Sequence, residues 1–109
     1  MGKEGLVGTV VYEENTYRST TRNTFYLIIS ETPRTVMLQR LDSIQETANG
    51  QRGMERASPK PAPGYDDPRF HIRARKNQPD EPGDYLWFSY KRQAFFIWDG
   101  KPRVFDTMD

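Results

Sequence analysis

The stretch Asp84–Phe105, DYLWFSYKRQAFFIWDGKPRVF, decides the fold expected of this chain. It contains both tryptophans, four of the six phenylalanines and two of the six tyrosines. Aromatic and β-branched side chains favour strands, so this composition predicts strands at Tyr85–Tyr90 and Ala94–Trp98. Asp99-Gly100 predicts a tight hairpin turn, because glycine readily adopts the positive φ that such a turn requires, and Arg103–Phe105 follows as the returning strand. The chain is therefore expected to fold around an aromatic β-sheet.

Outside that stretch, alternating apolar residues predict further strands. These are Leu6–Tyr12, Thr24–Glu31, Thr35–Leu41 and Arg69–Lys76. Thr32-Pro33-Arg34 is predicted to be the turn of a hairpin, since proline pre-sets the φ of such a turn. The polar segment Glu13–Asn23 shows no helical apolar period and is predicted to be a loop that orders on binding.

From residue 43 to about residue 68 the strand pattern is lost. A short helical turn is predicted around Ile44–Ala48, and the proline-rich segment Ala57–Asp67 is expected to be stiff and extended. A connection of this length in a small domain is usually functional or loosely ordered, which makes this flexible loop an alternative recognition element. The predicted fold is all-β, a small curved sheet of five or six strands, barrel-like, with a long Pro-rich loop.

Length and composition predict one domain, residues 1–109, with a small core. Only 35% of the residues are hydrophobic and 28% are charged, so aromatic side chains must fill much of the interior. The chain has no cysteine, which excludes disulfides and cysteine metal sites. No apolar segment is long enough to span a bilayer and no signal region is visible, so a soluble, cytoplasmic protein is expected.

The formal net charge of +1 hides a bias towards arginine, which supplies eleven of the sixteen basic residues. The planar guanidinium group suits phosphate, carboxylate and stacking contacts better than the lysine ammonium does. A nearly neutral total argues against indiscriminate binding of nucleic acid, but it permits a basic face beside an acidic one.

Several short motifs occur in a fixed order. They are Tyr17, Thr20, Phe25-Tyr26, Thr35-Val36-x-Leu38, the basic run Phe70–Lys76, Ser89-Tyr90, and Trp98-Asp99-Gly100-Lys101-Pro102 followed by Thr107. In this order the chain resembles a family of short uncharacterised proteins carried mainly by bacteriophages, plasmids and phage-rich bacterial genomes. The match spans most of the chain except the Pro-rich middle, and its Trp-Asp-Gly-Lys-Pro ending is the most specific part. The resemblance implies a mobile-element setting and an all-β domain, and it implies no particular activity.

The predicted strand Arg69–Lys76 carries the best candidate for anion binding. Its apolar positions are expected to face inward: Phe70, Ile72 and Ala74. Alternate residues of a strand project together, so His71, Arg73 and Arg75 would share the opposite face and the two guanidinium groups could straddle phosphates. The plain alternative is a solvated face whose charges pair with acids of the segment 80–84.

A second candidate is the polar loop, where Tyr17 could stack on a base while Arg18 and Arg22 hold its phosphate. The alternative is a loop whose tyrosine packs on the sheet. The complete predicted ligand set assigns phosphate to Arg73, Arg75, Arg40, Arg18 and Arg22, and stacking to Tyr17, Tyr26 and Trp87.

The C-terminal aromatics outnumber the positions that one face of a thin sheet can bury. Trp87, Tyr90 and Phe96 could therefore form an exposed patch or a subunit interface, and a homo-oligomer is expected. The alternative is a core built from aromatic side chains because aliphatic ones are scarce.

Catalytic and metal sites find little support. One histidine and no cysteine leave no constituents for a catalytic triad or a zinc site, and the aspartates lack the spacing of a calcium loop. No cofactor is expected. The sequence favours a non-enzymatic binding protein of a phage or mobile element that recognises a nucleotide signal or short nucleic acid, in order to counter host defence. The alternative is a protein–protein inhibitor of a host or defence protein that acts through its aromatic sheet face.

Overall fold

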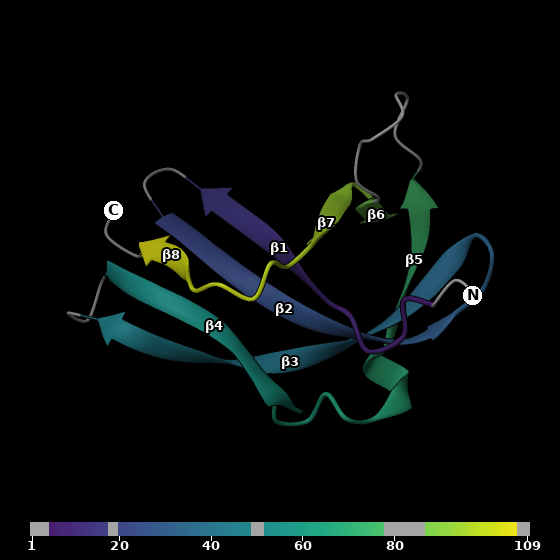
Figure 1. Ribbon diagram of the computed structural model, residues 1–109, viewed down its shortest axis with the longest axis horizontal. Coiled ribbons are helices and arrows are strands. Elements are labelled where there is room, and N and C mark those ends of the chain that lie inside the picture. The colour runs from purple at the N-terminus through teal and green to yellow at the C-terminus, as the bar shows by residue number, and fades with distance from the viewer. Residues whose placement is uncertain (1–4, 18–19, 49–51, 78–86, 107–109) are drawn as a thin grey trace.

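The computed structural model describes residues 5–17, 20–48, 52–77 and 87–106. Within these residues the chain forms eight strands and a single turn of 3-10 helix, η1 (Figure 1). The strands are β1 (Val10–Tyr17), β2 (Thr20–Glu31), β3 (Thr35–Ala48), β4 (Arg52–Pro61), β5 (Ile72–Asn77), β6 (Trp87–Tyr90), β7 (Gln93–Ile97) and β8 (Arg103–Asp106), with η1 at Pro68–Phe70 between β4 and β5. Among the described residues, no helix is long and apolar enough to cross a membrane.

Six of the strands close into an antiparallel barrel in the order β1-β2-β3-β5-β6-β7. The ring closes where β1 pairs with β7, with Val11 opposite Ile97 and Tyr12 opposite Phe96. The prediction of an all-β, curved, barrel-like fold is confirmed, although the described chain has eight strands where five or six were predicted.

The two longest strands, β2 and β3, also take part in a second ring. They pair with each other only from Phe25 opposite Leu41 to Glu31 opposite Val36. Beyond Phe25 and Leu41 they part, and β8 and β4 fill the gap in the order β2-β8-β4-β3. Figure 1 shows these two strands beside the diverging ends of β2 and β3. We call the parting point at Phe25 and Leu41 the strand fork.

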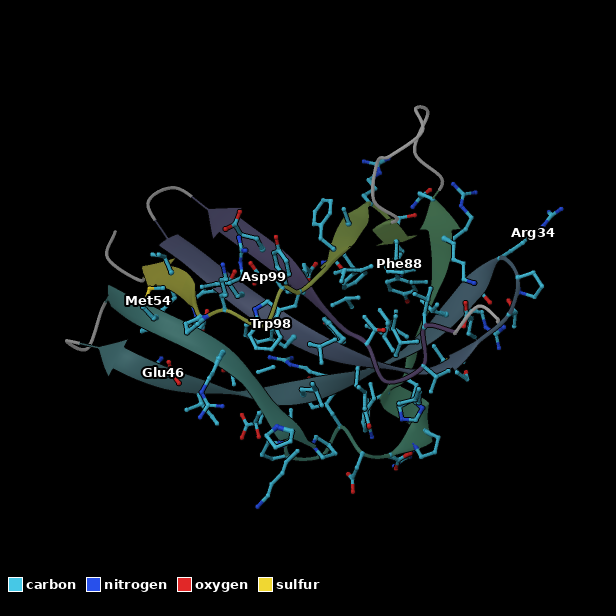
Figure 2. All side chains as sticks on the ribbon, viewed as in Figure 1. Arg34, Glu46, Met54, Phe88, Trp98 and Asp99 are labelled. Carbon is cyan, nitrogen blue, oxygen red and sulfur yellow. The ribbon has the colours of Figure 1, made fainter. Side chains whose placement is uncertain are left out.

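Each ring has its own apolar core. Inside the six-stranded barrel the buried residues are Val11, Tyr26, Ile28, Val36, Leu38, Ala74, Phe88 and Phe95. Figure 2 shows Phe88 among the side chains enclosed by the barrel. At the strand fork, Phe25, Leu41 and Ala57 form a smaller core, against which the half-buried Trp98 packs with its ring centroid 5.2 Å from that of Phe25. Aromatic rings thus supply much of the interior, as the scarcity of aliphatic residues predicts.

A buried polar network joins the two rings. Glu55 of β4 is completely buried, and its Oε2 accepts hydrogen bonds from the backbone N–H (3.0 Å) and the Nδ2 (2.9 Å) of Asn23 on β2. The same Nδ2 donates to the Val104 carbonyl of β8 (2.9 Å), and Arg103 Nε donates to Asn23 Oδ1 (3.3 Å). The Arg103 guanidinium also lies 4.0 Å from the centroid of the Tyr12 ring. Four strands, β1, β2, β4 and β8, therefore meet at one set of polar contacts.

The predicted loops at 13–23 and 43–68 are wrong for most of their length. The described part of Glu13–Asn23 belongs to the β1–β2 pair, with Glu14 opposite Asn23. Residues 43–48 and 52–61 lie in β3 and β4, including the predicted helical turn at Ile44–Ala48. Pairing of each strand with the next strand in the chain supplies the backbone hydrogen bonds and overrides weak local propensity. The prolines of β4 are tolerated because β8 pairs only with the part of β4 from Arg52 to Glu55, so the rest of that edge needs no N–H donor.

The predicted hairpin across Asp99-Gly100 is also wrong, although a turn exists there. Gly100 has φ +86°, and the Asp99 carboxylate accepts a hydrogen bond from the Lys101 N–H (2.9 Å). However, β7 pairs with β1 and β6, whereas β8 pairs with β2 and β4. The backbone N–H of Trp98 donates to the Val10 carbonyl (2.9 Å), so the chain stays beside β1 at the end of β7. It then continues to β8 in the second ring. By contrast, the hairpin turn predicted at Thr32-Pro33-Arg34 is confirmed.

The buried network predicts a large effect of Asn23→Ala. The substitution removes a donor to Glu55 and to the Val104 carbonyl, and it leaves a buried carboxylate with one hydrogen bond fewer. We expect the free energy of unfolding to fall by about 1–3 kcal/mol, measured from the midpoint of urea unfolding.

Glu46→Ala is the matched control, because it removes an exposed ion pair with Arg56 on the same β3–β4 pair. Its expected effect is below about 1 kcal/mol. Equal losses in the two variants would show that the buried network contributes no more than a surface ion pair.

Candidate anion-binding groove

The outer face of β5 carries two arginines side by side. Arg73 and Arg75 are exposed, whereas Ala74 between them is completely buried in the barrel. Arg75 lies opposite Thr35 of β3 on one side and Ser89 of β6 on the other. The predicted alternation is therefore confirmed from Ile72 to Arg75, and it sets both guanidinium groups on the barrel's outer surface.

Two turns add further cations beside this pair. Arg34 lies at the tip of the β2–β3 hairpin, where Thr32 Oγ1 accepts the N–H groups of Arg34 (3.3 Å) and Thr35 (2.9 Å), and its side chain projects outward (Figure 2). Lys91 lies in the β6–β7 turn with φ +56°, and its Nζ is 5.3 Å from the centroid of the Tyr90 ring.

Together these residues line an open groove of about 560 Å³. Its lining is Arg34, Thr35, Arg73, Arg75, Ser89, Tyr90 and Lys91, which we call the basic groove. The volume lies in the range of sites that bind small ligands. Four cations, two hydroxyl groups and one aromatic ring thus converge from three separate parts of the chain.

The positive charge of the basic groove is not neutralised by the described residues. Within them, Arg34, Arg73, Arg75 and Lys91 form no ion pair with a carboxylate. The nearby Glu31 pairs with Lys76 (2.6 Å), whose side chain is largely buried. The predicted alternative partners at 80–84 lie outside the described residues. The described part of the groove therefore presents four cations to solvent.

His71 does not join the two arginines. It follows η1 directly, before β5 begins, and it does not line the basic groove. Its Nε2 atom is buried and has no hydrogen-bond partner among the described residues. Phe70, which was predicted to face inward, is 49% exposed because η1 interrupts the strand alternation before Ile72. The inward positions of the strand are Ile72 and Ala74.

Arg22 and Arg40 come together at a different place, the strand fork. They line a cavity of about 260 Å³ with Asn23, Thr24, Phe25, Leu41, Asp42, Ser43 and Ala62, which we call the fork cavity. The Arg40 guanidinium lies 4.9 Å from the centroid of the Tyr65 ring, and its Nη1 donates to the Tyr65 hydroxyl (3.3 Å). The predicted arginines therefore divide between two sites.

Tyr26 does not reach the surface in the way that a stacking role requires. Its side chain is 7% exposed, and its ring packs edge-on against Phe95 at 5.2 Å. Burial, and to a lesser extent the nearby Glu13 carboxylate, raise the pKa of Tyr26 to about 12. The stacking role assigned to Tyr26 is thus replaced by a role in the core.

The other predicted aromatics give a mixed result. Tyr17 and Trp87 lie in β1 and β6, but their side chains fall outside the described residues, as does Arg18 altogether. Tyr90 and Phe96 are half-buried, whereas Phe88 and Phe95 are completely buried. The predicted homo-oligomer stays a prediction.

Three residues of the basic groove were not predicted as part of a phosphate site. Arg34, Tyr90 and Lys91 lie in or beside turns, and only the register of β3, β5 and β6 brings them to Arg75. The one sequence feature that could have indicated Arg34 and Lys91 is that each is a cation in a turn. Among the described residues, no three carboxylate, histidine or cysteine side chains gather as metal ligands would.

Comparison of the chain with protein-family models, curated proteins and solved structures returns no match. The function of the basic groove therefore has to follow from its geometry and charge.

The raised pKa of Tyr26 predicts a loss of stability in alkali. The folded state keeps the phenol proton up to about pH 12, whereas the unfolded chain releases it near the ordinary value of 10.0. The folded state therefore binds more protons between these values, so this contribution is intact below pH 10 and decreases as the pH rises from 10 to 12.

Tyr26→Phe removes that proton and should flatten this part of the decline, measured as the urea midpoint at a series of pH values. An identical decline in the variant and the wild type would mean that Tyr26 is not the group responsible.

Proposed function

We propose that the protein is a non-enzymatic binding protein that recognises a phosphate-bearing ligand, a nucleotide or a short nucleic acid, in the basic groove. The observation that carries the proposal is the convergence of Arg34, Arg73, Arg75 and Lys91 on one groove without a described acidic partner. Exposed like charges repel one another, so four cations together favour the binding of an anion.

The arrangement of the groove suits several phosphate oxygens at once. Arg73 and Arg75 are two positions apart on β5, which separates their Cα atoms by roughly 7 Å. Each guanidinium group can donate two parallel hydrogen bonds to a phosphate. The hydroxyl groups of Thr35 and Ser89 flank Arg75 and can donate to the remaining oxygens, while the Tyr90 ring offers a surface for a base.

The lining of the groove favours binding over catalysis. Its described lining contains no carboxylate and no imidazole that could serve as a general base for the hydroxyl groups. His71 is the only histidine of the chain, and it lies outside the groove. A bound phosphate ester would therefore be held without being cleaved.

The biological setting of the proposal follows from the resemblance to short proteins of phages and plasmids. A cytoplasmic protein of a mobile element that sequesters a nucleotide signal or a short nucleic acid would blunt a host defence. The rival function, a protein–protein inhibitor acting through its aromatic sheet face, draws less support, because Tyr90 and Phe96 of that face are half-buried and the Trp87 side chain lies outside the described residues.

The double variant Arg73→Ala, Arg75→Ala tests the proposal. Affinity would be measured by calorimetry against mononucleotides, cyclic dinucleotides and short oligonucleotides. We expect the variant to lose more than about tenfold in affinity per arginine, because a hydrogen bond to a charged group contributes about 1.5–3 kcal/mol. The slope of log K against log salt should also decrease by about 1 for each phosphate contact removed.

Arg56→Ala is the matched control, since Arg56 pairs with Glu46 away from the groove. It should leave both the affinity and the salt dependence unchanged. Both arginines of the groove are exposed, so the urea midpoint of the double variant should stay close to that of the wild type. A wild-type protein that binds none of these ligands, or a double variant that binds them equally well, would contradict the proposal.

A further inference from the structure

A second feature of the surface is a pair of aromatic rings in contact, with an arginine at each end of the pair. The Arg40 guanidinium lies 4.9 Å from the Tyr65 ring centroid, and the Tyr65 and Phe70 centroids are 5.5 Å apart. The Arg69 guanidinium lies 5.8 Å from the Phe70 ring. We call these four residues the aromatic stack. Its members come from β3, from the β4–η1 connection and from η1 itself.

The outer ring of this stack is open to solvent. Phe70 is 49% exposed, which makes it one of few large apolar side chains on the surface among the described residues. The half-buried Tyr65 packs against the Phe70 ring at an interplanar angle of 55°. An exposed ring backed by a second ring presents a flat surface on which a planar group can stack.

The backbone holds Phe70 in this position. Asp67 caps η1, with its Oδ1 accepting the Arg69 N–H (2.9 Å), and its carbonyl accepts the Phe70 N–H (3.0 Å). Asp67 Oδ2 also accepts hydrogen bonds from Arg69 Nη2 (2.8 Å) and Nε (3.1 Å), and these side-chain bonds are the main cause of the lowered pKa of Asp67. A ring fixed in this way loses little conformational freedom when a ligand stacks on it.

The charge around the stack differs from that of the basic groove. Arg69 is paired with Asp67, and Arg40 shares the fork cavity with Asp42. This part of the surface is therefore close to neutral, which suits the face of a base better than a phosphate. The fork cavity, which begins at Arg40, adds about 260 Å³ of polar space beside the rings.

β5 connects the aromatic stack to the basic groove, because Phe70 lies just before this strand and Arg73 and Arg75 lie on it. β5 begins two positions after Phe70 and leads away from η1 towards the groove (Figure 1). At the rise of an extended chain, Arg73 lies roughly 10 Å and Arg75 roughly 17 Å from Phe70. A single mononucleotide does not span that distance, whereas a chain of a few nucleotides does.

We propose that Phe70, backed by Tyr65, stacks on a base of a single-stranded nucleic acid whose phosphates lie in the basic groove. This inference rests on the proposed function and narrows it, because it makes the ligand an oligonucleotide. Single-strand binding proteins combine a cationic path for the backbone with aromatic rings that stack on bases of any sequence.

Phe70→Ala, measured with thymidine monophosphate as the shorter probe and oligo(dT) of about twelve nucleotides as the longer probe, tests the inference. The longer probe reaches the stack and should bind about tenfold more weakly to the variant, which is within the range for loss of one base stack. The shorter probe, held in the basic groove, should bind unchanged. Stacking involves no counterion release, so the salt dependence should stay that of the wild type, whereas Arg75→Ala should lower the slope by about 1.

Two further variants separate stacking from simple apolar contact. Phe70→Trp keeps an aromatic face and should retain the affinity for the longer probe. Phe70→Leu keeps apolar volume without a π-face and should lose it. The urea midpoints of all three variants report whether the fold survives.

Each remaining outcome decides against the inference. Full binding of the longer probe by Phe70→Ala or Phe70→Leu would overturn it. The proposed function would still stand if the Arg73→Ala, Arg75→Ala variant weakened binding in the same assay. Absence of any binding by the wild-type protein, to nucleotides and to both probes, would remove the inference and the proposed function together.

Discussion

A completely buried carboxylate holds the two rings of this fold together. Where β2 and β3 part, the backbone N–H of Asn23 has Glu55 Oε2 as its acceptor, so a side chain of β4 takes the place of a neighbouring strand. Removing a charge from water is costly unless its oxygens are hydrogen-bonded, and Glu55 Oε1 has no such partner among the described residues. The fork is therefore specified by a contact that tolerates few substitutions, and the positions of β4 and β8 depend on it.

The fork in turn separates the surfaces on which function is proposed. The six-stranded barrel carries the basic groove on the outer side of β3, β5 and β6. Ala74, between Arg73 and Arg75 in the sequence, faces the interior of the barrel and is completely buried. The fork cavity and the aromatic stack lie where the strands diverge, and Arg40 belongs to both. The basic groove thus offers positive charge and the aromatic stack offers aromatic rings. A single-stranded nucleic acid, with its charged backbone and planar bases, can use both.

Local patterns in the sequence were enough to predict the parts of this arrangement that depend on neighbours along the chain. The alternation of Arg73 and Arg75 with Ala74 and the hairpin turn before Thr35 are of this kind. Pairing between distant segments was not predictable, because nothing local in Asp99-Gly100 indicates that the following strand, β8, pairs with β2 and β4. For the same reason Arg34 and Lys91 were missed, since only the register of three strands brings them to the groove.

The closure of the barrel by β1 and β7 has a consequence for how the chain is made. Val11 pairs with Ile97 and Thr21 pairs with Asp106, so β1 and β2 find these partners in segments that are synthesised much later. Chains emerge from the ribosome at about 5–20 residues per second, which leaves the first strands exposed for several seconds without their final neighbours. Nascent chains of this protein would therefore offer unpaired strand edges and apolar side chains to chaperones until β7 and β8 leave the exit tunnel.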